Sequence, residues 1–135
     1  MRSPRQILCV EDDQDVRELL SILFRRAGYE VKSACTLEEG VDLARRESFE
    51  LYILDQMFSD GMGLDLCRQL RGFDSQTPIL FFSGLASAID RERAMEAGAQ
   101  GYLIKPNDLG IIIDTVTRLT GERCPSGQEK VKGQS

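Results

Sequence analysis

QILCVEDD, residues 6–13, is a short apolar run that ends in three acidic residues. An almost unbroken apolar run of this length is typical of a parallel strand that is covered on both faces. Five such runs recur at intervals of about twenty to thirty residues, and they are Gln6–Val10, Tyr29–Ala34, Leu51–Leu54, Ile79–Phe82 and Gly101–Ile104. The second run mixes polar and apolar residues, which predicts a strand at an edge of the sheet.

Helical periodicity separates these runs. Apolar residues at i, i+3, i+4 and i+7 predict a first helix that ends at Gly28, with an inward stripe of Val16, Leu19, Leu20, Leu23 and Ala27. A second helix is expected after Thr36, which is a suitable N-cap, and Glu39 occupies the matching capping-box position. Its inward residues are Leu37, Val41 and Ala44.

Three more helices complete the pattern. The third is expected to contain Leu64, Cys67 and Leu70–Arg71 and to be closed by Gly72. The fourth spans about Ser87–Ala97 and carries many charges, so much of it should face water. The fifth spans about Asp108–Leu119, with Leu109, Ile112, Ile113 and Val116 inward and Ile111 outside that stripe.

Five strands that alternate with five helices predict an α/β fold. Parallel strands with right-handed crossovers place helices on both faces of the sheet. We expect a doubly wound, five-stranded parallel sheet of flavodoxin-like (βα)5 type, with strand order 2-1-3-4-5. Residues 1–120 would form this single domain, and residues 121–135 would be a polar tail or the start of a linker.

The composition excludes several classes of protein. The chain of 135 residues has a formal net charge of −5, which gives no reason to expect direct nucleic-acid binding. The sequence contains no signal-peptide core and no apolar segment of about 20 residues, so we expect a cytoplasmic location and no membrane association. The four cysteines form no C-x-x-C pair, which argues against a disulfide framework or a zinc site. Histidine is absent, so a histidine needed in any reaction must come from a partner.

Polar side chains follow four of the five predicted strands. They are Glu11-Asp12-Asp13 after the first, Asp55 after the third, Ser83-Gly84 after the fourth and Lys105-Pro106 after the fifth. Because the carboxyl ends of parallel strands meet at one edge, these groups should lie together. Each has an ordinary explanation as a helix cap, a turn or a surface loop. The combination is much harder to explain as chance, and it predicts a functional site.

This combination favours phosphoryl transfer. Clustered carboxylates repel one another, and a hard divalent cation such as Mg²⁺ relieves that repulsion. Asp55 would then be a nucleophile that forms an aspartyl phosphate. The Ser83 hydroxyl and the Lys105 ammonium would hold the remaining phosphoryl oxygens. Positioning and electrostatics are sufficient for such chemistry, which agrees with the absence of histidine.

From about Gln6 to Leu119 the sequence resembles the receiver domain of two-component response regulators. Four blocks carry the resemblance, and they are Ile7–Asp13, Leu54–Met57, Pro78–Gly84 and Ala97–Pro106. The resemblance implies that Asp55 is the phosphoacceptor, with Ser83 and Lys105 binding the phosphoryl group. It also implies that Mg²⁺ is held by Asp12 directly, by Glu11 through water, by Asp55 and by the main-chain carbonyl of Met57. Asp13 matches a variable position.

The resemblance also implies a switch and a set of partners. Ser83 and Tyr102 are the switch residues, and phosphorylation would change the face made by the fourth helix, the fifth strand and the fifth helix. The phosphodonor would be a histidine kinase, a phosphotransfer protein or a small acyl phosphate. The output would come from a downstream protein or an output domain outside this chain, with a homodimer through the switch face as a further possibility. The domain would catalyse its own phosphorylation and dephosphorylation and would not be an enzyme for external substrates.

Three features depart from the family pattern. Ser59 stands where a proline is usual, which predicts a less rigid loop after the phosphoacceptor. Gly84 stands where alanine is commoner. Met57 and Leu85, which flank the site, are both apolar and cannot orient a water molecule, so we predict slow self-dephosphorylation. Gly63 matches the glycine that the family carries after the loop.

Three alternative functions agree less well with the sequence. A degenerate receiver that acts as an unphosphorylated interaction module is disfavoured by the complete set of Glu11, Asp12, Asp55, Ser83 and Lys105. A hydrolase of the haloacid dehalogenase class needs a second aspartate two residues after the nucleophile, where this chain has Met57. A flavodoxin-like electron carrier would have a Ser-, Thr- and Gly-rich loop after the first strand, and this loop is acidic.

Overall fold

The computed structural model describes residues 5–121. Its elements are β1 (Arg5–Val10), α1 (Gln14–Arg26), β2 (Tyr29–Ala34), α2 (Leu37–Arg46), β3 (Leu51–Leu54), β4 (Met57–Phe58), β5 (Gly61–Met62), α3 (Gly63–Phe73), β6 (Ile79–Ser83), α4 (Ala88–Glu96), β7 (Gly101–Ile104), the 3₁₀ helix η1 (Asn107–Ile111) and α5 (Ile112–Gly121). The predicted tail spans residues 121–135; Gly121 is the last residue of α5, and the rest of the tail lies outside the described residues, so the domain boundary stays a prediction.

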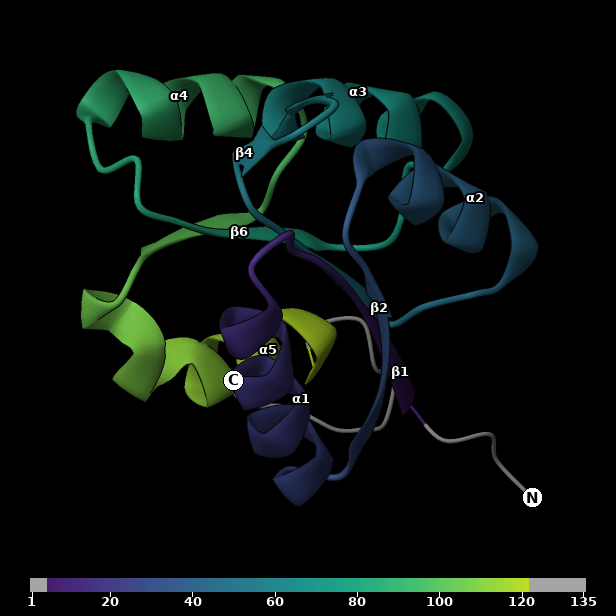
Figure 1. The fold of residues 1–135 in the computed structure, drawn as a ribbon, viewed down its shortest axis with the longest axis vertical. Helices are drawn as coiled ribbons and strands as arrows, with labels where there is room; N and C mark the ends of the chain where they lie inside the picture. The colour runs from purple at the N-terminus through teal and green to yellow at the C-terminus, as the bar shows by residue number, and fades with distance from the viewer. Residues whose placement is uncertain (1–4, 122–135) are drawn as a thin grey trace.

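A five-stranded parallel sheet forms the centre of the fold. Its strand order is β2-β1-β3-β6-β7, which confirms the predicted order because β4 and β5 belong to a separate short hairpin. The mixed strand β2 lies at an edge, as expected. Helices α2, α3 and α4 cover one face of the sheet, and α1 and α5 cover the other (Figure 1).

Two apolar clusters hold the helices on the sheet. On the side of α2, α3 and α4, the cluster includes Tyr52, Leu66, Leu70 and Phe81. On the side of α1 and α5, the other includes Ile7, Phe24, Ile53 and Ile112. Alternate residues of β3 enter opposite clusters, since successive side chains of a strand point to opposite faces. This double burial explains why the strands are recognisable as continuous apolar runs.

Helix α1 differs from its prediction in which residues face the core. Leu20 and Phe24, four residues apart, are buried, whereas Leu19 is 41% exposed and Ala27 is exposed. Leu19 is rotated by about 100° around the helix from Leu20, and in α1 this rotation places Leu19 outside the buried stripe. The inward placement of Leu19 and Ala27 was wrong. Gly28 does follow the end of the helix, with φ of 97°.

Other helix ends also differ in detail. Thr36 caps α2 by accepting from the Glu39 amide, but the Glu39 carboxylate accepts from the Cys35 amide one residue earlier. Gly72 lies inside α3, which continues to Phe73. The last helix begins with the 3₁₀ turn η1, and Ile111 is 49% exposed, as expected for a residue outside the buried stripe. No helix between residues 5 and 121 is long and apolar enough to cross a membrane.

Candidate functional site

The carboxyl ends of the sheet strands bring the predicted site residues to one edge. Parallel register aligns Val10 with Leu54, Leu54 with Phe81, and Ser83 with Ile104. The residues that immediately follow β1, β3 and β7 are Glu11, Asp55 and Lys105, and Ser83 is the last residue of β6. Residues more than ninety positions apart therefore meet at this edge.

Lys105 joins the two buried carboxylates. Its Nζ lies 2.9 Å from Glu11 Oε1 and 3.0 Å from Asp55 Oδ2. The side chains of Glu11, Asp55 and Lys105 are 3%, 10% and 20% exposed, so little water screens these pairs. Burial raises the pKa of Glu11 to about 7, although the hydrogen bond from Lys105 opposes the rise. Burial lowers the pKa of Lys105, but its bonds to Glu11 and Asp55 outweigh that effect and leave it raised.

Three carboxylates make the edge suitable for a divalent cation. One oxygen each from Glu11, Asp12 and Asp55 lies within 4.8 Å of the others. Hard oxygen donors at this spacing suit Mg²⁺, which binds through one or two carboxylates and retains several waters. Asp12 is exposed, as a ligand open to solvent would be. Met57 lies in β4, and its side chain points into solvent with 57% exposure.

The third acid of the run has a structural role. Asp13 is the N-cap of α1, and its Oδ1 accepts from the amides of Asp15 at 2.9 Å and Val16 at 3.2 Å. The Asp13 amide in turn donates to Glu11 Oε2 at 3.2 Å. Arg17 donates to the Glu11 carbonyl at 2.9 Å. The start of α1 therefore holds Glu11 in its buried position.

The main chain after Asp55 folds tightly against that residue. The Gln56 amide donates to Asp55 Oδ1 at 2.7 Å, and the Gly63 amide donates to the Gln56 carbonyl at 2.8 Å. A Cβ atom on Gly63 would lie 2.0 Å from the Asp55 carbonyl oxygen. A side chain at this position is therefore excluded by the main chain of the site itself.

Ser83 and Tyr102 meet at the main chain of Leu85. The buried Ser83 Oγ accepts from the Leu85 amide at 3.1 Å. The Tyr102 hydroxyl donates to the Leu85 carbonyl at 2.7 Å, and its ring stacks on Phe81 with centroids 5.6 Å apart. The two residues predicted to form the switch are therefore joined through one intervening residue. Sequence reasoning missed this role of Leu85, because main-chain atoms leave no signal in residue identity.

A second missed residue is Asp60, in the turn between β4 and β5. Its carboxylate accepts from the amides of Leu37 at 3.0 Å and Glu38 at 3.3 Å, at the start of α2. Asp60-Gly61 is a turn signal that could have predicted the hairpin. Nothing in the sequence indicates that the carboxylate reaches a helix 23 residues earlier in the chain.

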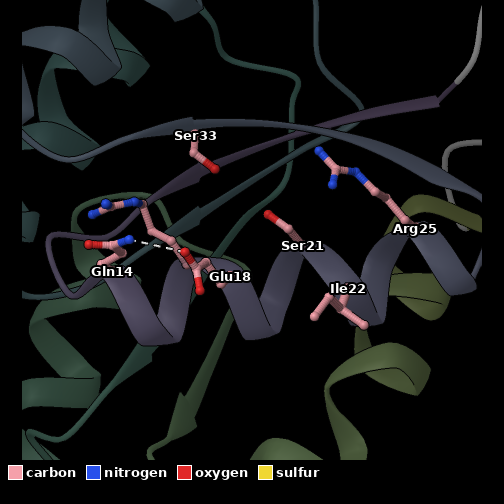
Figure 2. Close-up of a pocket in the computed structure, with 7 residues that line it drawn as sticks. Gln14, Glu18, Ser21, Ile22, Arg25 and Ser33 are labelled. Atoms are coloured by element: carbon pink, nitrogen blue, oxygen red, sulfur yellow. Dashed lines mark hydrogen bonds between the residues drawn. The ribbon is translucent and has the colours of Figure 1, made fainter.

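A groove of about 380 Å³ lies elsewhere, along α1. It is lined by Gln14, Arg17, Glu18, Ser21, Ile22, Arg25 and Ser33. Figure 2 shows Ser21 and Arg25 extending from the helix toward the strand that carries Ser33, and Gln14 bonded to Glu18, at 3.0 Å. None of the strand-end residues lines this groove. The candidate chemistry therefore belongs to the sheet edge.

The chain matches a known protein family. Residues 7–117 match the family described as the response regulator receiver domain. The chain is 35% identical over 127 residues to the response regulator protein PilR of Pseudomonas aeruginosa, covering 94% of this chain and 28% of that protein. The chain spans between about a quarter and a half of the length of the curated relatives first matched.

Solved structures give the same result for the fold. A two-component response regulator from Clostridium difficile superposes with a TM-score of 0.83 at 25% identity, covering 91% of this chain and 99% of that one. The chemotaxis protein CheY4 of Vibrio cholerae gives a TM-score of 0.81 at 26% identity, with 87% and 99% covered. These similarities span the elements that build the strand-end site.

Proposed function

Because this chain belongs to the response regulator receiver domain family, we propose that Asp55 is its phosphoacceptor and that Ser83 and Lys105 bind the transferred group. Receiver domains are signalling modules of two-component systems that phosphorylation switches, and they bind Mg²⁺ at an acidic pocket. The observation that carries the assignment is the position of Lys105, within 3.0 Å of Asp55 and 2.9 Å of Glu11. The degenerate receiver remains the alternative, and the complete set of charged groups disfavours it.

The donor set fits the metal. Glu11, Asp12, Asp55 and the main-chain carbonyl of Met57 would hold Mg²⁺. The carboxylate oxygens already lie within 4.8 Å of one another, so little rearrangement is needed to bring them to one ion. When bound, Mg²⁺ would offset the carboxylate repulsion and neutralise charge that develops on the phosphoryl oxygens.

Transfer is a single displacement at phosphorus. An Asp55 carboxylate oxygen forms a bond to phosphorus, and the bond from phosphorus to the donor breaks with its electron pair leaving on the donor. With acetyl phosphate the leaving group is acetate. Lys105 stays beside the new phosphoryl group and supplies positive charge there, and the Ser83 hydroxyl can donate to a phosphoryl oxygen.

The signal would leave the site through Leu85. If the Ser83 hydroxyl turns toward a phosphoryl group, its bond with the Leu85 amide is released. The Tyr102 hydroxyl holds the carbonyl of the same residue, so the aromatic ring and the β6–α4 connection respond together. The face made by α4, β7 and α5 would then change between two states whose free energies differ by a few kcal/mol.

The partners follow from the chemistry. The chain contains no histidine, so a phosphohistidine donor must belong to a histidine kinase or a phosphotransfer protein. We propose a cytoplasmic location and an output carried by a downstream protein or a further domain. A homodimer through the α4-β7-α5 face is part of the same proposal, and direct nucleic-acid binding by this domain is not.

Intact-mass spectrometry tests the assignment. The full chain is incubated with acetyl phosphate, with and without Mg²⁺, alongside Asp55→Asn and the surface control Asp42→Asn. The expected result is a Mg²⁺-dependent gain of one phosphoryl group in the wild type and the control, and none in Asp55→Asn. A wild type that gains no phosphoryl group would leave the degenerate receiver as the better account.

A further inference from the structure

The hairpin that follows the phosphoacceptor carries one of the proposed metal ligands. In β4 and β5, Met57 pairs with Met62 and Phe58 pairs with Gly61, so Ser59 and Asp60 form the turn. The Gly63–Gln56 main-chain bond closes the base of the hairpin. Met57 lies near this base, and the position of its carbonyl depends on how the whole hairpin is held.

The turn of the hairpin is bonded to the start of α2. Leu37 and Glu38 carry the first two helical amides, and both donate to the Asp60 carboxylate, at 3.0 and 3.3 Å. The third amide, of Glu39, donates to Thr36 Oγ1 at 3.1 Å. Thr36 accepts from only one of these three amides, and Asp60 completes the helix cap by accepting from the other two. A negative charge at this end of the helix is also favoured by its dipole.

Packing holds the same contact. A Cβ atom on Gly61 would lie 2.6 Å from Leu37 Cδ1, so the main chain of the turn rests directly on α2. Gly61 has φ of 149°, a conformation that side chains rarely allow. Phe58 packs against the apolar cluster below α2 and α3. The hydrogen bond from Leu37 lowers the pKa of Asp60, so the ionised, accepting form is favoured.

We propose that Asp60 is a positioning residue for the metal site, acting by fixing the β4–β5 hairpin, and with it the Met57 carbonyl, against α2. The inference rests on the proposed function. Ser59 stands where the family has a rigid proline, so the restraint on this hairpin comes instead from the bonds to α2. Coupling of this kind is reciprocal: if the capped α2 favours metal binding, the metal favours the capped α2.

The first test compares side chains that keep or lose an acceptor. The full chain, as wild type and as Asp60→Ala, Asp60→Asn and Asp60→Ser, is titrated with Mg²⁺ alone, and backbone amide shifts near Asp12 and Asp55 give the dissociation constant. We expect binding to weaken about three- to tenfold in Asp60→Ala, in the range of a lost helix cap, and less in the Asn and Ser variants. Asp42→Asn is the matched control, because Asp42 is exposed on the same helix and pairs with Arg46.

This series separates positioning from charge. All three Asp60 variants lose one negative charge, so a purely electrostatic effect would weaken binding equally in each. Equal weakening in the three variants, or wild-type affinity in Asp60→Ala, overturns the inference. A wild type that binds no Mg²⁺ overturns the proposed metal site and the inference with it, so the two failures are distinguishable.

The second test reads the coupling at α2. Amide hydrogen exchange of Leu37 and Glu38 is measured with and without Mg²⁺. Both amides are distant in sequence from the carboxylates of the proposed metal site. We expect Mg²⁺ to slow exchange at both amides in the wild type and to have no effect on them in Asp60→Ala. A merely structural cap would give the same exchange rate with and without Mg²⁺ in the wild type, and that result overturns the coupling.

Discussion

Polar side chains cluster at both ends of the central sheet, but the interactions that hold these side chains differ between the two ends. At the carboxyl end, one ammonium, Lys105, lies between two carboxylates, and a third carboxylate is exposed nearby. At the opposite end, each polar group is held by several bonds to fixed neighbours. Arg71 donates to the carbonyls of Gly98 and Asp74 and to Gln100.

Asp74 is the second centre of that opposite end. Its carboxylate accepts from the Tyr52 hydroxyl at 2.6 Å, the Thr77 hydroxyl at 2.7 Å and the amides of Gln76 and Thr77. Burial alone would raise the pKa of Asp74, but the bonds from Tyr52 and Thr77 dominate and lower it to about 2. These hydrogen bonds tie the end of α3 to β3 and to the segment before β7.

The difference assigns separate tasks to the two ends. Bonds that are all satisfied internally stabilise one arrangement, whereas an excess of carboxylates leaves negative charge that an external cation can balance. Substitutions at the carboxyl end should therefore change phosphorylation, and those at the opposite end should change stability alone.

Gly63→Ala should have the largest effect. Its Cβ would lie 2.0 Å from the Asp55 carbonyl, so the main chain must shift, at a cost of about 3 kcal/mol in the free energy of unfolding. Urea denaturation measures the loss, and phosphorylation by acetyl phosphate should fall with it. Gly72→Ala is the control, because among the described residues nothing lies within 4 Å of the added Cβ. Equal stability of the two variants would contradict the assigned role of Gly63.

Lys105→Met should act mainly on chemistry. It removes the ammonium that faces Asp55, and the initial rate of phosphorylation should fall about tenfold or more, as when a charge-stabilising donor is lost. In the absence of Mg²⁺ the melting temperature should also fall, and Mg²⁺ should recover part of it. Lys32→Met, at an exposed pair with Glu47, should leave the rate unchanged. A wild-type rate in Lys105→Met would remove the main argument for the site.

Tyr52→Phe tests most directly whether the two ends of the sheet act independently. Loss of the hydroxyl leaves Asp74 with one donor fewer and costs about 1 kcal/mol in the free energy of unfolding. The rate of phosphorylation and the Mg²⁺ affinity should stay at wild-type values, because Tyr52 lies at the opposite end of β3 from Asp55. A change in either value would show that the two ends are coupled.

The smallest effect concerns pH. The pKa of Asp74 is lowered on folding from its ordinary value of 3.8 to about 2. Ionised Asp74 therefore stabilises the fold fully above about pH 5, and this contribution is lost as the pH falls towards 2. Thermal unfolding of wild type and Asp74→Asn should differ more at about pH 6 than at about pH 3. A difference that grows as the pH falls would contradict this sign.

Much of the scaffold was predictable because β1, β3, β6 and β7 are largely buried on both faces. Every predicted sheet strand lies within one residue of its observed bounds. A continuous apolar run can be identified in a sequence without knowledge of the strand with which it pairs. The shared location of four predicted site residues followed from the sheet, because the carboxyl ends of parallel strands lie at the same edge. Each of these residues ends or immediately follows such a strand, and they are Glu11, Asp55, Ser83 and Lys105. Features that depend on contacts across the chain were missed: the β4–β5 hairpin, the Asp60 cap and the core position of Phe24.

The shared contact at Leu85 leaves one side chain unconstrained. Ser83 and Tyr102 bond to the amide and carbonyl of Leu85, and any residue type except proline supplies both groups. Substitutions at position 85 other than proline should therefore leave the two bonds of the proposed switch in place. The same freedom is useful for biosensor engineering. Under the proposed function, a library randomised at position 85 would vary the lifetime of the phosphoryl group and leave the hydrogen bonds from Ser83 and Tyr102 to the main chain in place.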